Sequence, residues 1–268
     1  MTSITAPDLL TTIVAATERI VEVRATEITI AQLEERCEAA ARRPDGVAFE
    51  RALRQSAAPR VIAECKRRSP SRGILRQEYD PATLAAAYAA AGAAAISVLT
   101  EPTFFDGALE HLQQVRGAVG VPLLRKDFIV SRYQLLEAAA AGADAVLLIV
   151  SALDDRRVRT LLGDADALGL ACLVEVHDTA EIARAVDAGA RIVGVNSRNL
   201  RTLAVDMEVL DGAAAMLPAG VTAVAESGIT SRDDIDRLAA AGYHAFLVGE
   251  RLITQADPGA ALTVLRGH

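Results

Sequence analysis

The chain has 268 residues, a formal net charge of −7 and a pI near 5.2, and this length suits one large α/β domain or two small ones. The acidic balance and an aromatic content of 3% disfavour a nucleic-acid-binding protein, which would need basic surfaces or stacking aromatic side chains. No apolar run approaches the roughly 18 to 20 residues of a membrane-spanning helix, and we expect no membrane partner.

Three cysteines, Cys37, Cys65 and Cys172, are too few and too scattered for a disulfide framework or a metal site. With four histidines and no His-x-x-x-His pair, a structural zinc ion is not expected either. The N-terminus has no basic segment before an apolar core, as a secretory signal would require. These features predict a cytoplasmic protein with reduced thiols and no metal.

Residues 1–57 predict two or three amphipathic helices ahead of the first strand. Apolar residues recur there at helical spacing, and Thr29 with Gln32 has the spacing of a capping box. We expect this helical extension to plug the bottom of the following domain, to flank its mouth, or simply to pack against its side.

Residues 58–268 contain eight short apolar runs, whose starts lie about 20 to 35 residues apart. Unbroken runs rich in Val and Ile are typical of parallel strands that are covered on both faces. Eight βα units close a barrel. We therefore predict an α/β fold, a (β/α)8 TIM barrel with an N-terminal helical extension, as a single domain over residues 1–268. The runs begin at residues 61, 95, 121, 145, 172, 192, 221 and 245.

The segments between these runs carry helix signals. Ser131 with Gln134 has the spacing of a capping box at a helix start. Four of these segments end in Ala-Gly. A helix C-cap in the left-handed conformation explains each glycine, and the recurrence supports a repeated unit. The four glycines are Gly92, Gly142, Gly189 and Gly242.

Polar residues follow the carboxyl ends of the predicted strands, where barrels of this type hold their catalytic groups. Glu64 and Lys66 lie two residues apart and therefore point to the same face of the first strand. Charged side chains are rarely buried without a partner or a ligand, so this pair indicates a site. The other predicted strand ends carry Thr100, Glu101, Lys126, Asp127, Glu175, His177, Asn196, Arg198, Glu226, Ser227, Gly249 and Glu250.

Lys126 lies near the end of the apolar stretch "VPLLRKD". Burial there could lower the pKa of its ammonium group, which would suit Lys126 to general acid catalysis. Neighbouring Asp127 could instead pair with Lys126. His177 is interpreted as a rim residue rather than the catalytic base, and Cys65 should face the helices.

The turns after the seventh and eighth strands favour a phosphate site. Ser227, Gly228 and Gly249 would leave backbone amide groups free at the start of the following helices. Phe105 and Phe128 fall in loops after the second and third strands. They could line an aromatic substrate or only pack under a loop.

The motifs "VIAECKRRSPSRG", "ISVLTEPTFFDG", "PLLRKDFIV", "GADAVLLIV", "LVEVH", "VGVNSRNL", "AESGI" and "FLVGE" occur in order over residues 61–250. Together they resemble the successive motifs of the indole-3-glycerol-phosphate synthase family. The resemblance implies cyclisation, decarboxylation and dehydration of 1-(2-carboxyphenylamino)-1-deoxyribulose 5-phosphate to indole-3-glycerol phosphate. It implies no organic cofactor and no metal.

The resemblance also implies catalytic roles. Lys126 matches the general acid that protonates the substrate carbonyl oxygen, and Glu175 matches a catalytic carboxylate with an acid/base or stabilising role. Lys66 matches a second lysine that binds the substrate carboxylate and serves in dehydration, with Glu64 and Asn196 beside it.

Substrate-binding roles follow in the same way. Arg198 would face an anionic group, while Phe105 and Phe128 would flank the aromatic ring of the substrate. Glu226 is counted with the substrate-binding residues. The phosphate would be surrounded by Ser69, Ser227, Gly228, Gly249 and Glu250.

Two alternatives stay open from the residues. Phosphoribosylanthranilate isomerase is another phosphate-binding barrel, and it uses a cysteine at the end of its first strand, a position that Cys65 could fill. A barrel kept only for assembly or regulation is the non-enzymatic alternative. The expected partner is a small phosphorylated aromatic substrate, and the expected state is a monomer or a weak homodimer.

Overall fold

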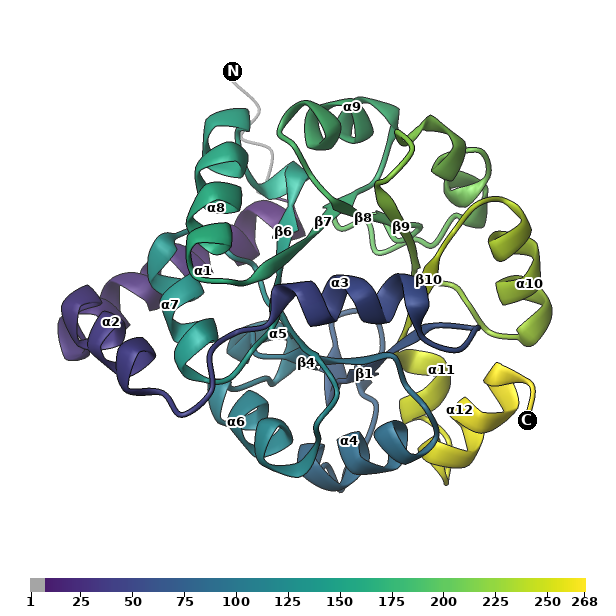
Figure 1. Cartoon of the computed structure of the whole chain (residues 1–268), viewed down its shortest axis with the longest axis horizontal. Helices are drawn as coiled ribbons and strands as arrows, with labels where there is room; N and C mark the ends of the chain where they lie inside the picture. The colour runs from purple at the N-terminus through teal and green to yellow at the C-terminus, as the bar shows by residue number, and fades with distance from the viewer. Residues whose placement is uncertain (1–7) are drawn as a thin grey trace, which may run out of the picture.

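The eight predicted strands form a closed parallel barrel in the computed structural model, which describes residues 8–268 (Figure 1). Neighbouring strands follow one another along the chain, and β1 (Val61–Cys65) closes the ring against β10 (Ala245–Val248). The fold is therefore the predicted (β/α)8 TIM barrel. The other barrel strands are β4 (Ala95–Leu99), β5 (Leu123–Lys126), β6 (Ala145–Ile149), β7 (Ala171–Val176), β8 (Ile192–Asn196) and β9 (Thr222–Glu226).

Strand side chains alternate between two apolar cores. Along β1, Val61 and Cys65 face outward into the layer between sheet and helices, whereas Ile62 faces the barrel interior. Cys65 is wholly buried in the outer layer, as strand parity predicted. Glu64 continues the inward series and reaches the cavity at the barrel mouth. A small hairpin of β2 (Arg68–Ser69) and β3 (Gly73–Ile74) follows β1.

Helices surround the barrel, with one exception. Between β8 and β9 the chain forms only two 3-10 turns, Met207–Leu210 and Ala214–Met216, because Gly212 between them has a positive φ that interrupts helical hydrogen bonding. None of the helices within residues 8–268 is long and apolar enough to cross a bilayer. The barrel helices are α4 (Pro81–Ala90), α5 (Pro102–Phe105), α6 (Leu109–Ala118), α7 (Arg132–Ala140), α8 (Asp155–Ala167), α9 (Thr179–Asp187), α10 (Arg232–Ala240), α11 (Glu250–Ile253) and α12 (Pro258–Arg266).

Local helix signals were mostly correct. The four Ala-Gly ends all place the glycine at positive φ. Thr29 and Gln32 form the predicted capping box at the start of α2 (Ile30–Ala39). The predicted capping box at Ser131 was wrong, because Ser131 makes no side-chain cap and the Gln134 amide bonds to the preceding loop instead.

The N-terminal extension contacts both ends of the barrel. Phe49 and Leu53 of α3 (Gly46–Gln55) pack into the interior core at the bottom, where α3 crosses the barrel axis (Figure 1). At the other end, the N-cap of α1 (Leu9–Glu27), Asp8, forms an ion pair with Arg201 in the loop that follows β8 at the mouth. The extension therefore both plugs the bottom and flanks the mouth.

A buried carboxylate anchors the segment between α2 and α3. Asp144 is fully buried at the start of β6 and accepts hydrogen bonds from Arg42 at 2.6 Å and from Arg116 at 3.1 Å. It also accepts the backbone N–H groups of Asp45 at 3.0 Å and Leu123 at 2.9 Å. Four donors thus compensate the desolvation of one charge.

Candidate active site

A cavity of about 450 Å³ opens at the carboxyl ends of the strands, and every barrel strand contributes to its lining. The structure brings together in it all of the residues to which the resemblance gives catalytic or binding roles, whereas Thr100, Glu101 and His177 at the same strand ends are not among its lining residues. The residues with these roles are Glu64, Lys66, Ser69, Phe105, Lys126, Phe128, Glu175, Asn196, Arg198, Glu226, Ser227, Gly228, Gly249 and Glu250.

Lys126 lies among carboxylates from three strands. Its Nζ atom is 3.2 Å from Glu175 Oε2 and 3.8 Å from Glu226 Oε2. Burial alone would lower the pKa of the Lys126 ammonium group, but the charges of Glu175, Glu226 and Glu64 outweigh burial and raise that pKa. The expectation of a lowered pKa was therefore wrong, and Lys126 is a protonated donor across the neutral range.

The suggested pairing of Lys126 with Asp127 was also wrong. Asp127 points into the layer outside the sheet, where its Oδ2 atom accepts a hydrogen bond from Arg125 at 2.9 Å. Successive residues of a strand face opposite sides, so Lys126 and Asp127 diverge. Arg125 is fully buried and was missed by the sequence reasoning. The sequence does hold a sign of this role: Arg125 falls at a strand position that faces outward and is buried, and a buried arginine requires a carboxylate partner.

Glu64 and Lys66 form the second pair at the mouth. Lys66 Nζ lies 2.5 Å from Glu64 Oε1. Burial would raise the pKa of the Glu64 carboxyl, but the charges of Lys66 and Lys126 outweigh burial and lower it. Glu64 is therefore a carboxylate that both lysines stabilise.

Glu175 and Glu226 flank the same ammonium group but have opposite pKa shifts. Burial would raise the pKa of Glu175, but Lys126 and His177 outweigh it and lower that pKa. Burial, together with the charge of Glu175, raises the pKa of Glu226 well above its ordinary value. Two carboxyl groups with separated pKa values can provide one base and one acid at the same pH.

His177 contacts Glu175 from the rim. Its Nε2 atom lies 3.3 Å from Glu175 Oε1, and its Nδ1 atom lies 3.0 Å from Glu181 Oε2. Burial would lower the pKa of His177, but these two carboxylates raise it to about 10. His177 is thus a rim residue, as predicted, but one that bears directly on Glu175.

The turn after β9 has a conformation suited to binding an anion. Ser227 and Gly228 both adopt positive φ, at 64° and 70°, which is uncommon for serine. No acceptor within residues 8–268 takes their N–H groups. Successive N–H groups in such a turn form a concave anion site.

Two cationic side chains, Arg72 and Arg198, line the same cavity as this turn, and both face Glu250. Glu250 Oε1 is 2.9 Å from Arg72 Nε, and Glu250 Oε2 is 3.8 Å from Arg198 Nη2. Asn196 Oδ1 accepts the N–H of Arg198 at 2.9 Å. Ser69 is buried nearby in the cavity wall. Arg72 was not named from the sequence.

Phe105 and Phe128 form an apolar wall on another arc of the mouth. Their ring centroids are 6.3 Å apart. Both line the cavity, and both also pack with the interior core. Glu101 fixes Phe105 by accepting the N–H groups of three successive residues of the short helix α5.

Comparisons with known proteins agree with this site. A family model described as indole-3-glycerol phosphate synthase matches residues 10–265. A protein of that name from Parafrankia sp. (strain EAN1pec) is 54% identical over 88% of this chain and 87% of its own length. Indole-3-glycerol phosphate synthase 1 from Streptomyces coelicolor is 50% identical over 90% of this chain and 88% of its own length.

Solved structures support the fold alone. A thiamine phosphate pyrophosphorylase from Pyrococcus furiosus superposes with a TM-score of 0.61 at 18% identity, over 81% of this chain and 96% of that one.

Proposed function

The chain belongs to the indole-3-glycerol phosphate synthase family, and from this premise we propose which residues of the mouth carry each step of the reaction. The enzyme is a carboxy-lyase of tryptophan biosynthesis. It converts 1-(2-carboxyphenylamino)-1-deoxyribulose 5-phosphate to indole-3-glycerol phosphate, CO2 and water.

Lys126 is the general acid of ring closure. The ring carbon that bears the carboxylate attacks the carbonyl carbon, and the carbonyl oxygen takes a proton from Nζ. The support is the position of Nζ, which lies in the cavity beside Glu175 and Glu226; the charges of these carboxylates raise its pKa, so the ammonium group carries the proton that it donates. Glu175, 3.2 Å away, stabilises the charge and orients the ammonium group.

Decarboxylation follows at the apolar wall. Loss of CO2 leaves its electron pair in the ring and restores aromaticity. Phe105 and Phe128 flank this ring and exclude water, which favours loss of a charged carboxylate. Lys66, held by Glu64 at 2.5 Å, and Arg198 bind the substrate carboxylate before it leaves.

Dehydration requires an acid and a base. Lys66 protonates the departing hydroxyl group. Glu175, which its lowered pKa keeps ionised, is the base that takes a proton from the CH2 group next to the ring nitrogen, so that the C–H electron pair forms the double bond of the indole as the hydroxyl leaves as water. Glu226 and Asn196 line the cavity beside Glu175 and bind the substrate there.

The substrate phosphate binds at the turn after β9. Ser227 and Gly228 offer backbone N–H groups, and Ser69, Gly249 and Glu250 complete the enclosure. The test is a structure with bound product. We expect the phosphate within hydrogen-bond distance of the Ser227 and Gly228 amides, and a phosphate elsewhere would refute this assignment.

One observation carries the proposal: a lysine ammonium 3.2 Å from a buried glutamate, in a cavity that joins an aromatic wall to an anion-binding turn. The direct test is turnover of the carboxyphenylamino-deoxyribulose phosphate by the purified protein, monitored through the fluorescence of the indole product. The alternative with a catalytic cysteine is disfavoured because Cys65 is buried outside the barrel and does not line the cavity. Absence of indole product would refute the proposal.

We propose a single domain that comprises the extension up to residue 57 and the barrel over residues 58–268. The hydrogen bond from Arg42 to Asp144 and the packing of α1 and α3 against the barrel core support this proposal. We propose that the protein works in the cytoplasm as a monomer or a weak homodimer. One chain supplies the whole cavity lining, and Cys37, Cys65 and Cys172 are unpaired. Sedimentation equilibrium tests the oligomeric state.

A further inference from the structure

The segment after β5 carries two of the residues to which we assign functions. Lys126 ends the strand, and Phe128 follows two residues later in the loop that leads to α7. Both side chains reach the cavity. The position of each therefore depends on how residues 126 to 130 are held.

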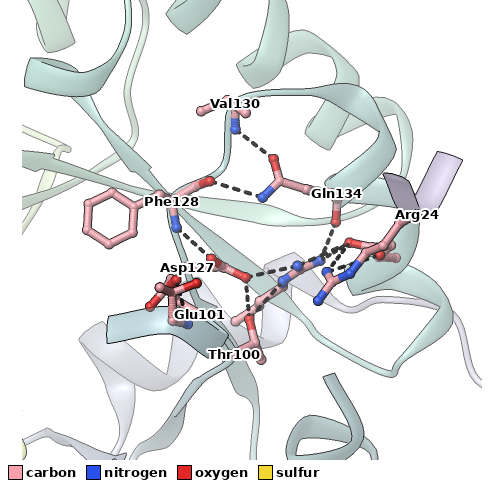
Figure 2. A network of polar contacts seen from close by, with 10 residues as sticks. Arg24, Thr100, Glu101, Asp127, Phe128, Val130 and Gln134 are labelled. Atoms are coloured by element: carbon pink, nitrogen blue, oxygen red, sulfur yellow. Dashed lines mark hydrogen bonds and ion pairs between the residues drawn. The ribbon is translucent and has the colours of Figure 1, made fainter. Parts of the chain in front are cut away.

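Asp127 fixes the backbone between these two residues. Its Oδ1 atom accepts the N–H of Phe128 at 2.8 Å, while Oδ2 accepts the hydroxyl of Thr100 at 2.6 Å and a guanidinium N–H of Arg125 at 2.9 Å. Figure 2 shows Asp127 between Thr100 and the backbone N–H of Phe128, whose ring points away from this network. The three bonds engage both oxygen atoms of the carboxylate, and a fully satisfied buried network of this kind is rigid.

Arg125 holds the Asp127 carboxylate on the side away from the cavity. Its Nη1 atom donates to the carbonyl oxygen of Gln134 at 2.7 Å, and Nη1 and Nη2 each lie 3.2 Å from Glu137 Oε2. Arg24 of α1 reaches the other oxygen of Glu137 at 3.4 Å. The buried charges are thus paired and hydrogen-bonded, which is the condition under which a buried network is rigid.

Gln134 clamps the far end of the segment. Its amide nitrogen donates to the carbonyl oxygen of Phe128 at 3.0 Å, and its amide oxygen accepts the N–H of Val130 at 2.9 Å. Figure 2 shows the side chain bridging Phe128 and Val130. Gln134 is buried and lies outside the cavity lining. The side chain of Gln134 therefore acts on the site only through this loop.

We propose that Asp127 and Gln134 are positioning residues, which hold residues 126 to 130 in the conformation that keeps Lys126 beside Glu175 and the Phe128 ring in the cavity wall. The inference rests on the proposed functions of Lys126 and Phe128. It adds Gln134, which lies outside the cavity lining, and Asp127, which borders the cavity but whose carboxylate is held by Thr100, Arg125 and the Phe128 N–H. Both determine how well the aromatic half of the substrate fits.

The test uses Gln134→Met, which keeps the length of the side chain and removes both bonds to the loop. We expect the KM for the natural substrate to rise about fivefold to tenfold, with a smaller change in kcat, as for loss of roughly one hydrogen bond in binding. Calorimetry with 2-aminobenzoate, which represents the aromatic half, should show a similar loss of affinity. Inorganic phosphate should bind as in the parent enzyme.

A second variant and a control separate positioning from general destabilisation. Asp127→Asn keeps an oxygen for the Phe128 N–H but loses the charge that faces Arg125, and we expect it to lower kcat more than Gln134→Met does. Asp45→Ala removes the N-cap of α3 at the bottom of the barrel. The Asp45 side chain accepts the Ala48 N–H there at 2.8 Å. This change should lower the Tm without changing either affinity.

Three outcomes are decisive. If Gln134→Met binds 2-aminobenzoate normally, the positioning role of Gln134 is refuted. If affinity for 2-aminobenzoate and for phosphate fall together, its role is only structural, and the proposal is again refuted. Should Gln134→Met not fold, Asp127→Asn with unchanged kcat would refute the proposal. Failure of the parent enzyme to form indole product would instead refute the proposed function.

Discussion

Gly249 and Glu64 lie so close that a Cβ atom on residue 249 would overlap the Glu64 carboxylate. The φ of Gly249 is −121°, outside the left-handed region, and the close approach of Glu64 is the feature that excludes a side chain here. In Gly249→Ala the added methyl group should push Glu64 off Lys66. We expect kcat/KM to fall about 10- to 100-fold, as for a misplacement of about 1 Å. Steady-state kinetics measures the loss.

The matched control is Gly163→Ala in α8, where an added Cβ meets nothing within 4 Å. It should leave kcat/KM unchanged and raise stability by about 0.5 to 1 kcal/mol, the difference in helix propensity. Equal kinetics in Gly249→Ala and Gly163→Ala would contradict the steric role of Gly249.

Lys126→Met removes the proposed acid. We expect kcat to fall about 10²- to 10⁴-fold, the usual contribution of a positioned acid or base. Lys126→Arg keeps the charge between the carboxylates, but guanidinium does not give up its proton, so its kcat should stay low. Rapid-quench kinetics with circular dichroism as a folding check distinguishes these effects. A folded Lys126→Met enzyme with normal turnover would disprove the assignment.

Glu226→Gln tests the carboxyl group with the raised pKa. Because the folded state binds this proton more tightly than the unfolded chain, wild-type stability should decrease as pH rises above the ordinary value of 4.5 and through the raised pKa. Glutamine has no proton to lose, so the variant should become more stable relative to wild type as pH rises. Urea unfolding at pH 5 and pH 8 measures the difference. Parallel pH profiles would rule out the raised pKa.

His177→Gln tests the histidine between two glutamates. Its folded pKa is raised to about 10, so its stabilising contribution is complete below the ordinary 6.5 and is lost as pH rises through about 10. The variant should be less stable than wild type at pH 6, and the gap should close toward pH 10. Thermal melts across this range provide the measurement. A gap that does not depend on pH would mean that His177 stays neutral.

Asp144→Asn separates stability from catalysis. The change leaves Arg42 and Arg116 without their buried partner charge, and breaking such a pair costs about 3 to 5 kcal/mol. Asp144 lies at the amino end of the barrel, so kcat per folded molecule should not change. Urea unfolding and kinetics at a temperature below the transition test both parts. A change in kcat with little loss of stability would contradict this account.

Most strand positions were predictable because parallel strands are buried on both faces and appear as unbroken apolar runs. The site was predictable because charges at strand ends, such as Glu64 and Lys66, need a partner or a ligand. Strand parity also placed Cys65 correctly on the outer face.

The pairing of charges was not predictable. The partners of Lys126 come from β7 and β9, and its pKa reflects the sum of three carboxylates against burial. Local spacing suggested Asp127 instead. In the same way, Gln134 has the spacing of a capping residue, but the loop before α7 offered its amide two backbone partners. Such choices depend on tertiary neighbours.

The N-terminal extension also constrains the order in which the chain folds. Arg24 bonds to Glu137 and Arg42 to Asp144, so these contacts join residues more than 100 positions apart. The barrel ring closes only when β10 pairs with β1. Non-local contacts form after the cost of loop closure has been met. During synthesis, the first helices to leave the ribosome therefore cannot make these contacts until residues 137 and 144 have followed them.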